Sequence, residues 1–198
     1  MTKSLSKFKT NISSSSVLER IFEYLDSKTL PFEPDELLRA EFVMVVSAFD
    51  CYIHDYVREK LLDIFKEPSA MTDRTKEYKI SFGAMMDIIN ESNPVTQIYL
   101  LEKEIKDIES KNTYQSSRNV EKALGLIGFR KIWSKIYGDA DAKTNKDQLD
   151  LIVRRRNQIA HEADMDFVTN KKNPIVLEDV LEAKKFLCEL ANKIDDLT

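Results

Sequence analysis

The residues best suited to chemistry lie in one polar segment near position 160. Arg156, Asn157 and His161 fall within six residues, in a stretch whose apolar spacing predicts a helix that ends near His161. A guanidinium holds two phosphate oxygens at once and keeps its charge, and an imidazole accepts and returns a proton near neutral pH. An Arg and a His at one site therefore suit a phosphodiester. RNA supplies its own nucleophile in the neighbouring 2′-hydroxyl, so its cleavage would need no metal-bound water.

The spacing within this segment sets how its side chains can meet. Asn157 and His161 are four residues apart and share a helix face, where the amide can orient the imidazole or bond the phosphate. Arg156 and His161 lie about 140° apart around an ideal helix, and a helix that ends or kinks near His161 would bring them closer. Arg154 and Arg155 complete a basic cluster. We interpret them as contacts to the substrate backbone, with a solvated charged face as the alternative.

A second polar pair, Asp50 and His54, is one turn apart on a predicted long helix. We interpret Asp50 as a residue that orients Arg156, and His54 as a candidate second catalytic histidine. The alternative is a polar stripe that satisfies itself at the bundle surface. Tyr114 and Tyr137 are aromatic candidates for stacking on single-stranded RNA bases.

The elements that must position these residues are predicted to be helices. Only 4 Gly and 5 Pro among 198 residues leave few hairpin turns and no glycine-rich phosphate loop. From Asp35 to about Phe65 the chain lacks both, and its apolar residues recur at three- and four-residue steps. We therefore expect an all-α antiparallel helical bundle dominated by a long second helix. The bundle forms one domain over residues 1–198, with a flexible start at 1–15. Further helices are expected at 16–25, 80–89, 95–109, 117–127, 147–161 and 178–194, with a solvated linker at 139–146.

Composition limits the other possibilities. Cys51 and Cys188 are expected to be buried, reduced thiols, and with only 2 His we expect no metal and no cofactor. The net charge of −4 means that any nucleic-acid contact must come from a local basic cluster. No apolar run approaches a membrane span or a secretion signal, so we expect a cytoplasmic protein without membrane contact.

A family resemblance becomes specific at these residues. The sequence from Arg156 to His161 resembles the R-x(4–6)-H motif of the HEPN superfamily, including the polar residue directly after the arginine. The segment from Arg39 to Val57 resembles the long second helix of the HEPN subgroup named after the RiboL-PSP association. The resemblance covers the chain from about residue 30 to its end.

The resemblance implies a helical bundle that dimerises, with two motifs facing each other across the twofold axis in one composite cleft. It implies a metal-independent endoribonuclease that leaves 2′,3′-cyclic phosphate ends, often a toxin or an antiphage-defence effector. Arg156 would clamp the scissile phosphate, His161 would be the acid and base, and Asn157 would be the polar helper. The expected partners are the RNA substrate, a second copy of the chain, and a neutralising antitoxin or defence-system partner.

Two alternatives remain open. The first is a non-catalytic HEPN module that binds a nucleotide, an RNA or a protein through the same groove. The second is a purely structural dimerisation unit, in which Arg156 and His161 have no ligand.

Overall fold

The fold is helical apart from one short hairpin. The computed structural model describes residues 1–197, and the prediction of an all-α protein is confirmed. None of the described helices combines the length and apolar character needed to cross a membrane. The elements, in chain order, are α1 (Lys3–Asp26), α2 (Asp35–Lys66), the 3-10 turn η1 (Pro68–Ala70), α3 (Asp73–Lys76), α4 (Phe82–Asn90), α5 (Pro94–Glu109), α6 (Ser117–Leu126), α7 (Ile132–His161), β1 (Met165–Asp166), β2 (Lys171–Lys172) and α8 (Leu177–Asp195).

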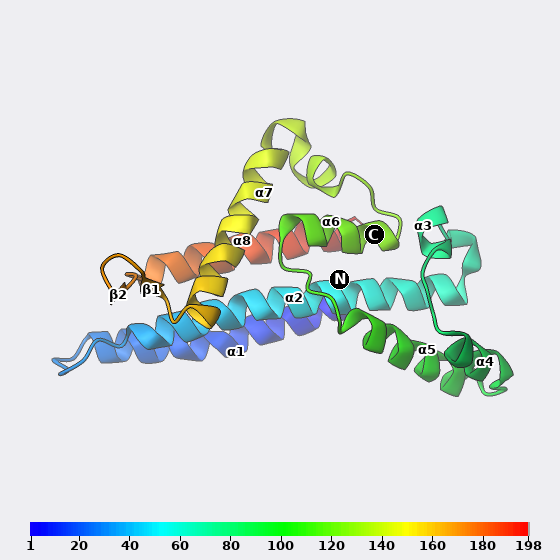
Figure 1. Cartoon of the computed structure of the whole chain (residues 1–198), viewed down its shortest axis with the longest axis horizontal. Coiled ribbons are helices and arrows are strands. Elements are labelled where there is room, and N and C mark those ends of the chain that lie inside the picture. The colour runs from blue at the N-terminus through cyan, green and yellow to red at the C-terminus, as the bar shows by residue number, and fades with distance from the viewer. Residues whose placement is uncertain (198) are drawn as a thin grey trace.

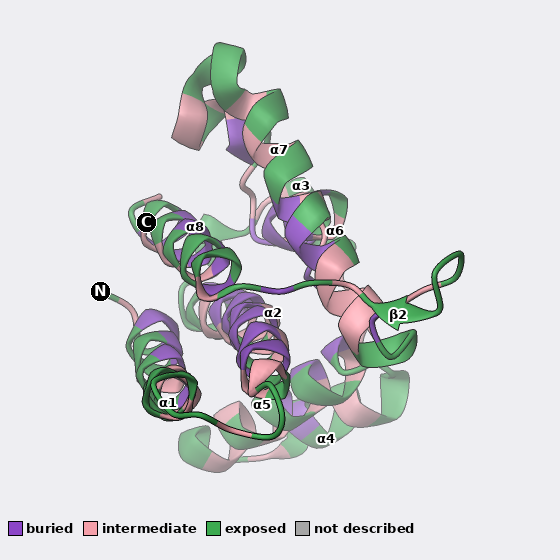
Figure 2. Ribbon diagram, turned by 90° about the vertical axis from the view of Figure 1, so that its left-hand side faces the viewer, coloured by how far each residue is buried: buried purple, intermediate pink, exposed green. Residues whose placement is uncertain are grey.

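The predicted long second helix, α2, is the centre of the molecule. One apolar face of the helix is buried from Leu38 to Ile64, and α1, α5, α6, α7 and α8 all pack against it. Helix α1 runs antiparallel to α2, whereas α8 runs in the same direction (Figure 1). The Tyr52 hydroxyl donates to the Ala191 carbonyl at 3.0 Å, and the Tyr56 hydroxyl donates to the Ile194 carbonyl at 3.2 Å. These hydrogen bonds fix α8 along the buried face of α2, which is coloured purple in Figure 2.

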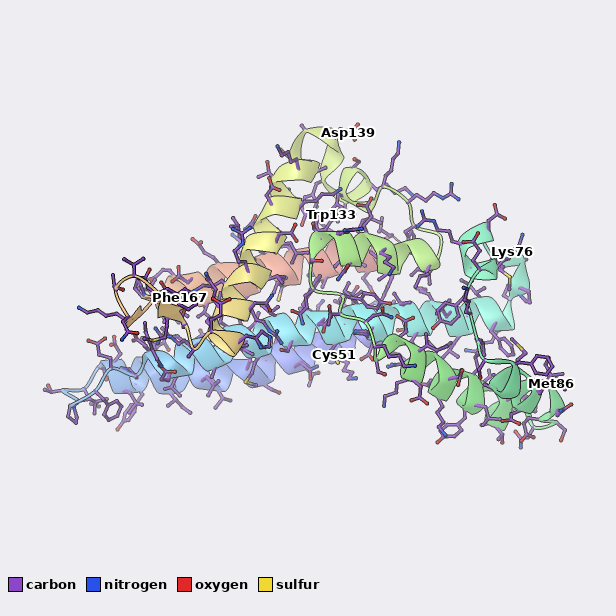
Figure 3. All side chains as sticks on the ribbon, viewed as in Figure 1. Cys51, Lys76, Met86, Trp133, Asp139 and Phe167 are labelled. Atoms are coloured by element: carbon purple, nitrogen blue, oxygen red, sulfur yellow. The ribbon has the colours of Figure 1, made fainter. Side chains whose placement is uncertain are left out.

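Helix α7 crosses α2 and α8 instead of lying along them (Figure 1), so the antiparallel arrangement is limited to part of the bundle. It bends at Gly138, whose φ of 75° is a left-handed value that favours glycine. Asp139, next to this bend, lies at the outer end of α7 (Figure 3). The predicted linker at 139–146 is wrong, because these residues are helical. The segment is polar because this part of α7 is mostly exposed, so it has no apolar stripe to reveal it.

The start of the chain is also ordered, which corrects the expectation of a flexible segment at 1–15. The Thr2 hydroxyl accepts a hydrogen bond from the Leu5 amide and caps α1. Leu5, Phe8 and Ile12 are buried against the rest of the core. Their spacing of three and four residues marks a helix face, but the surrounding Ser, Thr and Lys residues obscure it.

The two cysteines differ from each other. Both are free, but Cys51 is exposed on α2 and Cys188 is half-buried on α8. The expectation that both are buried is therefore wrong, since Cys51 lies on the solvent side of α2 (Figure 3).

Candidate functional site

The Arg-His motif occupies the last turns of α7. The helix ends at His161 because the chain reverses there, and the amides of Glu162 and Asp164 both donate to the Gln158 carbonyl at 3.0 Å. Ala163 and Asp164 take left-handed φ values of 51° and 58° to make this reversal. The motif is therefore presented on a helix end that is fixed by its own backbone hydrogen bonds.

The structure brings Arg156, Asn157 and His161 together. Arg156 Nη1 donates to Asn157 Oδ1 at 3.1 Å and lies 3.5 Å from His161 Nε2. Arg156 and Asn157 are half-buried and His161 is exposed, so the group opens to solvent. Within residues 1–197 Arg156 forms no ion pair, and its buried Nε has no hydrogen-bond partner. The result is a positive charge without a counter-ion beside an accessible imidazole, as an anion-binding site requires.

The neighbouring Arg155 has a different role from the one expected. Both of its terminal nitrogens bind the carboxylate of Asp164, with Nη2 to Oδ2 at 3.0 Å. Nη2 also donates to the Pro174 carbonyl at 3.0 Å. The terminal nitrogens of Arg155, which were expected to contact substrate, are held by an acid that is only 1% exposed. A carboxylate buried to this extent needs a cation beside it.

A second arginine completes this arrangement from α2. Arg39 is 6% exposed, and its Nε donates to Asp164 Oδ2 at 2.8 Å. Its Nη2 donates to the Asn173 carbonyl at 2.7 Å. Arg39, Asp164 and Arg155 form an ion cluster, hereafter the Asp164 cluster, that ties the end of α7 to α2. Asp164 precedes the hairpin, and both arginines donate to backbone carbonyls that follow it, so the cluster joins the two ends of the hairpin at the turn after His161.

Asp50 and His54 do not reach the motif. Asp50 accepts hydrogen bonds from the Tyr114 amide at 2.6 Å and from Gln115 Nε2 at 3.1 Å, and its Oδ1 lies 3.8 Å from His54 Nε2. The prediction that Asp50 orients Arg156 is wrong, because Asp50 faces the segment between α5 and α6. The alternative, a self-contained polar stripe, does not describe Asp50 either, because its hydrogen bonds go to Tyr114 and Gln115. His54 stacks on Tyr114 with 4.5 Å between ring centroids and has no contact with the motif within the described residues.

The two tyrosines considered for base stacking are not available. Tyr114 is buried, its hydroxyl bonds Glu109, and burial raises its pKa well above the usual range. Tyr137 stacks on the buried Trp133 at 6.2 Å, and burial raises the pKa of Tyr137 to about 12. Tyr114 therefore belongs to the interior of the protein, and the half-buried Tyr137 packs against it.

Arg154 is the remaining arginine of the cluster. It is exposed and makes no ion pair or hydrogen bond with the part of the chain that the structure describes. A solvated charge and a substrate contact are both compatible with this position. Elsewhere in residues 1–197, no three His, Cys, Asp or Glu side chains come together as metal ligands would.

The helical fold and the Arg156–His161 pair at the end of α7 define a protein of the HEPN class. The family model described as RiboL-PSP-HEPN matches residues 2–198, so the chain belongs to this family. The resemblance drawn from the motif and the second helix is thereby confirmed. No curated protein and no solved structure matches the chain. Membership associates the chain with ribonuclease or nucleotide-related function at the level of the superfamily.

Proposed function

We propose that the chain is a metal-independent endoribonuclease that cleaves RNA through attack of a 2′-hydroxyl on the adjacent phosphate. The observation that carries this proposal is the Arg156 guanidinium, which has no carboxylate partner in residues 1–197 and lies 3.5 Å from the exposed His161 imidazole. Attack of the 2′-oxygen forms a bond to phosphorus and expels the 5′-oxygen. The products are a 2′,3′-cyclic phosphate and a 5′-hydroxyl.

Each side chain has a role in this reaction. Arg156 binds the non-bridging phosphate oxygens and stabilises the charge that grows on them in the transition state. Asn157 holds the guanidinium through its 3.1 Å hydrogen bond. His161 removes the proton from the 2′-hydroxyl or donates one to the departing 5′-oxygen.

The proton count favours a dimer. The reaction removes one proton and donates another, and each chain offers one histidine at the motif. A twofold axis beside the end of α7 would place two imidazoles and two guanidiniums around one phosphate. The exposure of His161 is compatible with such a composite site.

The proposal is tested by the chemistry of the product ends. Purified protein is incubated with single-stranded RNA in EDTA, and the ends are identified by phosphatase sensitivity and mass spectrometry. We expect 2′,3′-cyclic phosphate and 5′-hydroxyl ends, and no cleavage of an RNA in which the nucleotide before the cut carries a 2′-deoxyribose. Ends with 5′-phosphate, or cleavage that needs an added divalent metal, would contradict the proposal.

A second function rests on the same unpaired guanidinium. Its free donors are sufficient to bind an anion without any reaction, so a non-catalytic module that binds RNA, a nucleotide or a protein partner is the alternative. Tight RNA binding without cleavage in the same incubation would favour this alternative.

The biological role is part of the proposal. An endoribonuclease that cuts cellular RNA damages its host unless its activity is restrained. We therefore propose a toxin or antiphage-defence effector, with a neutralising partner that restrains it.

Arg154 supplies a separate expected result. Arg154→Gln should weaken binding of single-stranded RNA several-fold at low salt and lower the slope of log K against log salt by about 0.7, the value for one lost phosphate contact. Titrations of fluorescent RNA at several salt concentrations measure both quantities. Arg74→Gln, which removes an exposed arginine from α3 at the other end of α2, is the matched control (Figure 1). Equal slopes for the two variants would show that Arg154 is only a solvated charge.

A further inference from the structure

The hairpin that follows the motif carries an exposed aromatic ring, Phe167, six residues after His161. The Met165 amide donates to the Glu162 carbonyl at 3.1 Å, so β1 begins within one turn of His161. Met165 pairs with Lys172 and Asp166 with Lys171. Two strand residues at about 3.3 Å each put the turn of the hairpin about 7 Å beyond its base. Figure 1 shows the hairpin directly after the end of α7, and Figure 3 labels Phe167 on it.

The turn of this hairpin is closed by hydrogen bonds, and its apolar side chains face water. Phe167 is 84% exposed and Val168 is 93% exposed. Asp166 Oδ1 accepts hydrogen bonds from the Val168 amide at 3.0 Å and from the Thr169 amide and hydroxyl at 2.6 and 2.8 Å. The bonds from Thr169 and Val168 lower the pKa of the Asp166 carboxyl. Asn170, with a φ of 52°, closes the turn through a 2.8 Å bond to the Asp166 carbonyl.

The surroundings of the turn are positively charged although the whole chain is not. Between positions 154 and 172 there are five basic and three acidic residues, in a chain with a net charge of −4. The buried Asp164 is neutralised by two arginines, whereas Asp166, held in the turn, and the exposed Glu162 keep their negative charges. Lys171 is exposed and forms no ion pair within the described residues. The cations left free are therefore Arg154, Arg156 and Lys171.

We propose that Phe167 stacks on an unpaired base of a single-stranded RNA whose backbone is held by Arg156 and the neighbouring cations. The proposal rests on RNA as the ligand of the Arg156–His161 site. Every base offers a flat apolar face to an aromatic ring, and phosphates complement the surrounding positive charge. A second copy of the chain is a less suitable partner than RNA if it contacts only the tip of the hairpin. Two apolar side chains are far smaller than the roughly 800 Å² per partner of a stable interface.

The experiment places a fluorescent ring at the tip. Phe167→Trp is made together with His161→Ala, so that bound RNA is not cut, and emission is followed during titration with a single-stranded oligoribonucleotide. The chain's one native tryptophan, Trp133, is 1% exposed, so its emission serves as a constant background. We expect RNA to quench the introduced indole. Phe167→Ala should weaken RNA binding by about five- to one-hundred-fold, and Phe167→Tyr should restore it.

Each other result has a defined meaning. The matched control is Tyr99→Trp in the same background, an exposed ring on α5, whose emission should not respond to RNA. RNA binding by anisotropy without quenching at Phe167→Trp would overturn the stacking proposal and leave the proposed function intact. Equal quenching by duplex RNA would contradict the proposal that the stacked base is unpaired. A change in emission that depends on protein concentration without RNA would assign the tip to a second copy. No RNA binding by the parent protein would overturn both proposals.

Discussion

His161→Ala is expected to lower the rate of RNA cleavage by at least about 100-fold, the usual effect of removing a general acid or base. The side chain is exposed, and within residues 1–197 its one polar contact is the 3.5 Å approach of Arg156 Nη1. Its removal should therefore change the free energy of unfolding by no more than about 0.5 kcal/mol. Single-turnover cleavage in EDTA and thermal unfolding measure the two effects. Cleavage by the variant at the parent rate would remove His161 from the mechanism.

His54→Ala is the matched control for this experiment. His54 lies on α2, stacks on Tyr114 and makes no contact with the motif in residues 1–197. We expect its variant to cleave RNA at the parent rate. A loss comparable to that of His161→Ala would restore His54 as a second catalytic histidine.

Mixing two inactive variants tests whether the cleft is composite. Arg156→Ala and His161→Ala are each expected to be inactive alone. In a dimer that combines both motifs around one phosphate, the mixed dimer retains one guanidinium and one imidazole from different chains. Partial recovery of cleavage on mixing would support the shared site, whereas no recovery would show that one guanidinium and one imidazole from different chains are not sufficient for cleavage.

The parts of the fold that were predictable from the sequence are those with a clear apolar period. Helix α2 has such a period over its whole length, and its predicted bounds differ by one residue from those observed. Residues 3–15 and 139–146 are helical where the sequence predicts a flexible start and a linker, and both differences have a common reason. Their helices are rich in polar residues, and what decides their structure is the packing of Phe8 against the core or the bend at Gly138. Neither the packing of Phe8 nor the bend at Gly138 can be inferred from the local composition.

The same limit applies to the site. The proximity of Arg156, Asn157 and His161 follows from their spacing and from a helix that ends at His161. The role of Arg155 does not, because it depends on Asp164 reaching back nine residues and on Arg39, which is 125 residues away from that carboxylate in the chain. Three consecutive arginines look equivalent in the sequence and have three different environments in the structure.

Asp164→Ala is expected to lower the free energy of unfolding by about 3–5 kcal/mol, the range for breaking a buried ion pair and leaving its partner unpaired. Asp164 is 1% exposed and pairs with both Arg39 and Arg155. Within residues 1–197 its loss leaves Arg155 without a counter-ion and leaves Arg39 with only the exposed Glu36, 3.3 Å from its Nη1. Denaturation in urea measures the effect. Glu162→Ala, an exposed acid two residues earlier, is the control and should change stability by no more than about 0.5 kcal/mol.

Asp164→Asn separates the charge of the cluster from its shape. The amide oxygen can still accept one hydrogen bond from an arginine, but the negative charge is gone, so most of the stability loss should remain. Because the Asp164 cluster fixes the turn after His161, we also expect the folded fraction of this variant to cleave RNA with a lower kcat. The KM should change less, since Arg156 and Arg154 are untouched. A loss of stability below about 1 kcal/mol would show that solvent or chain rearrangement screens the two arginines. An unchanged kcat would show that the cluster stabilises the fold without positioning the motif.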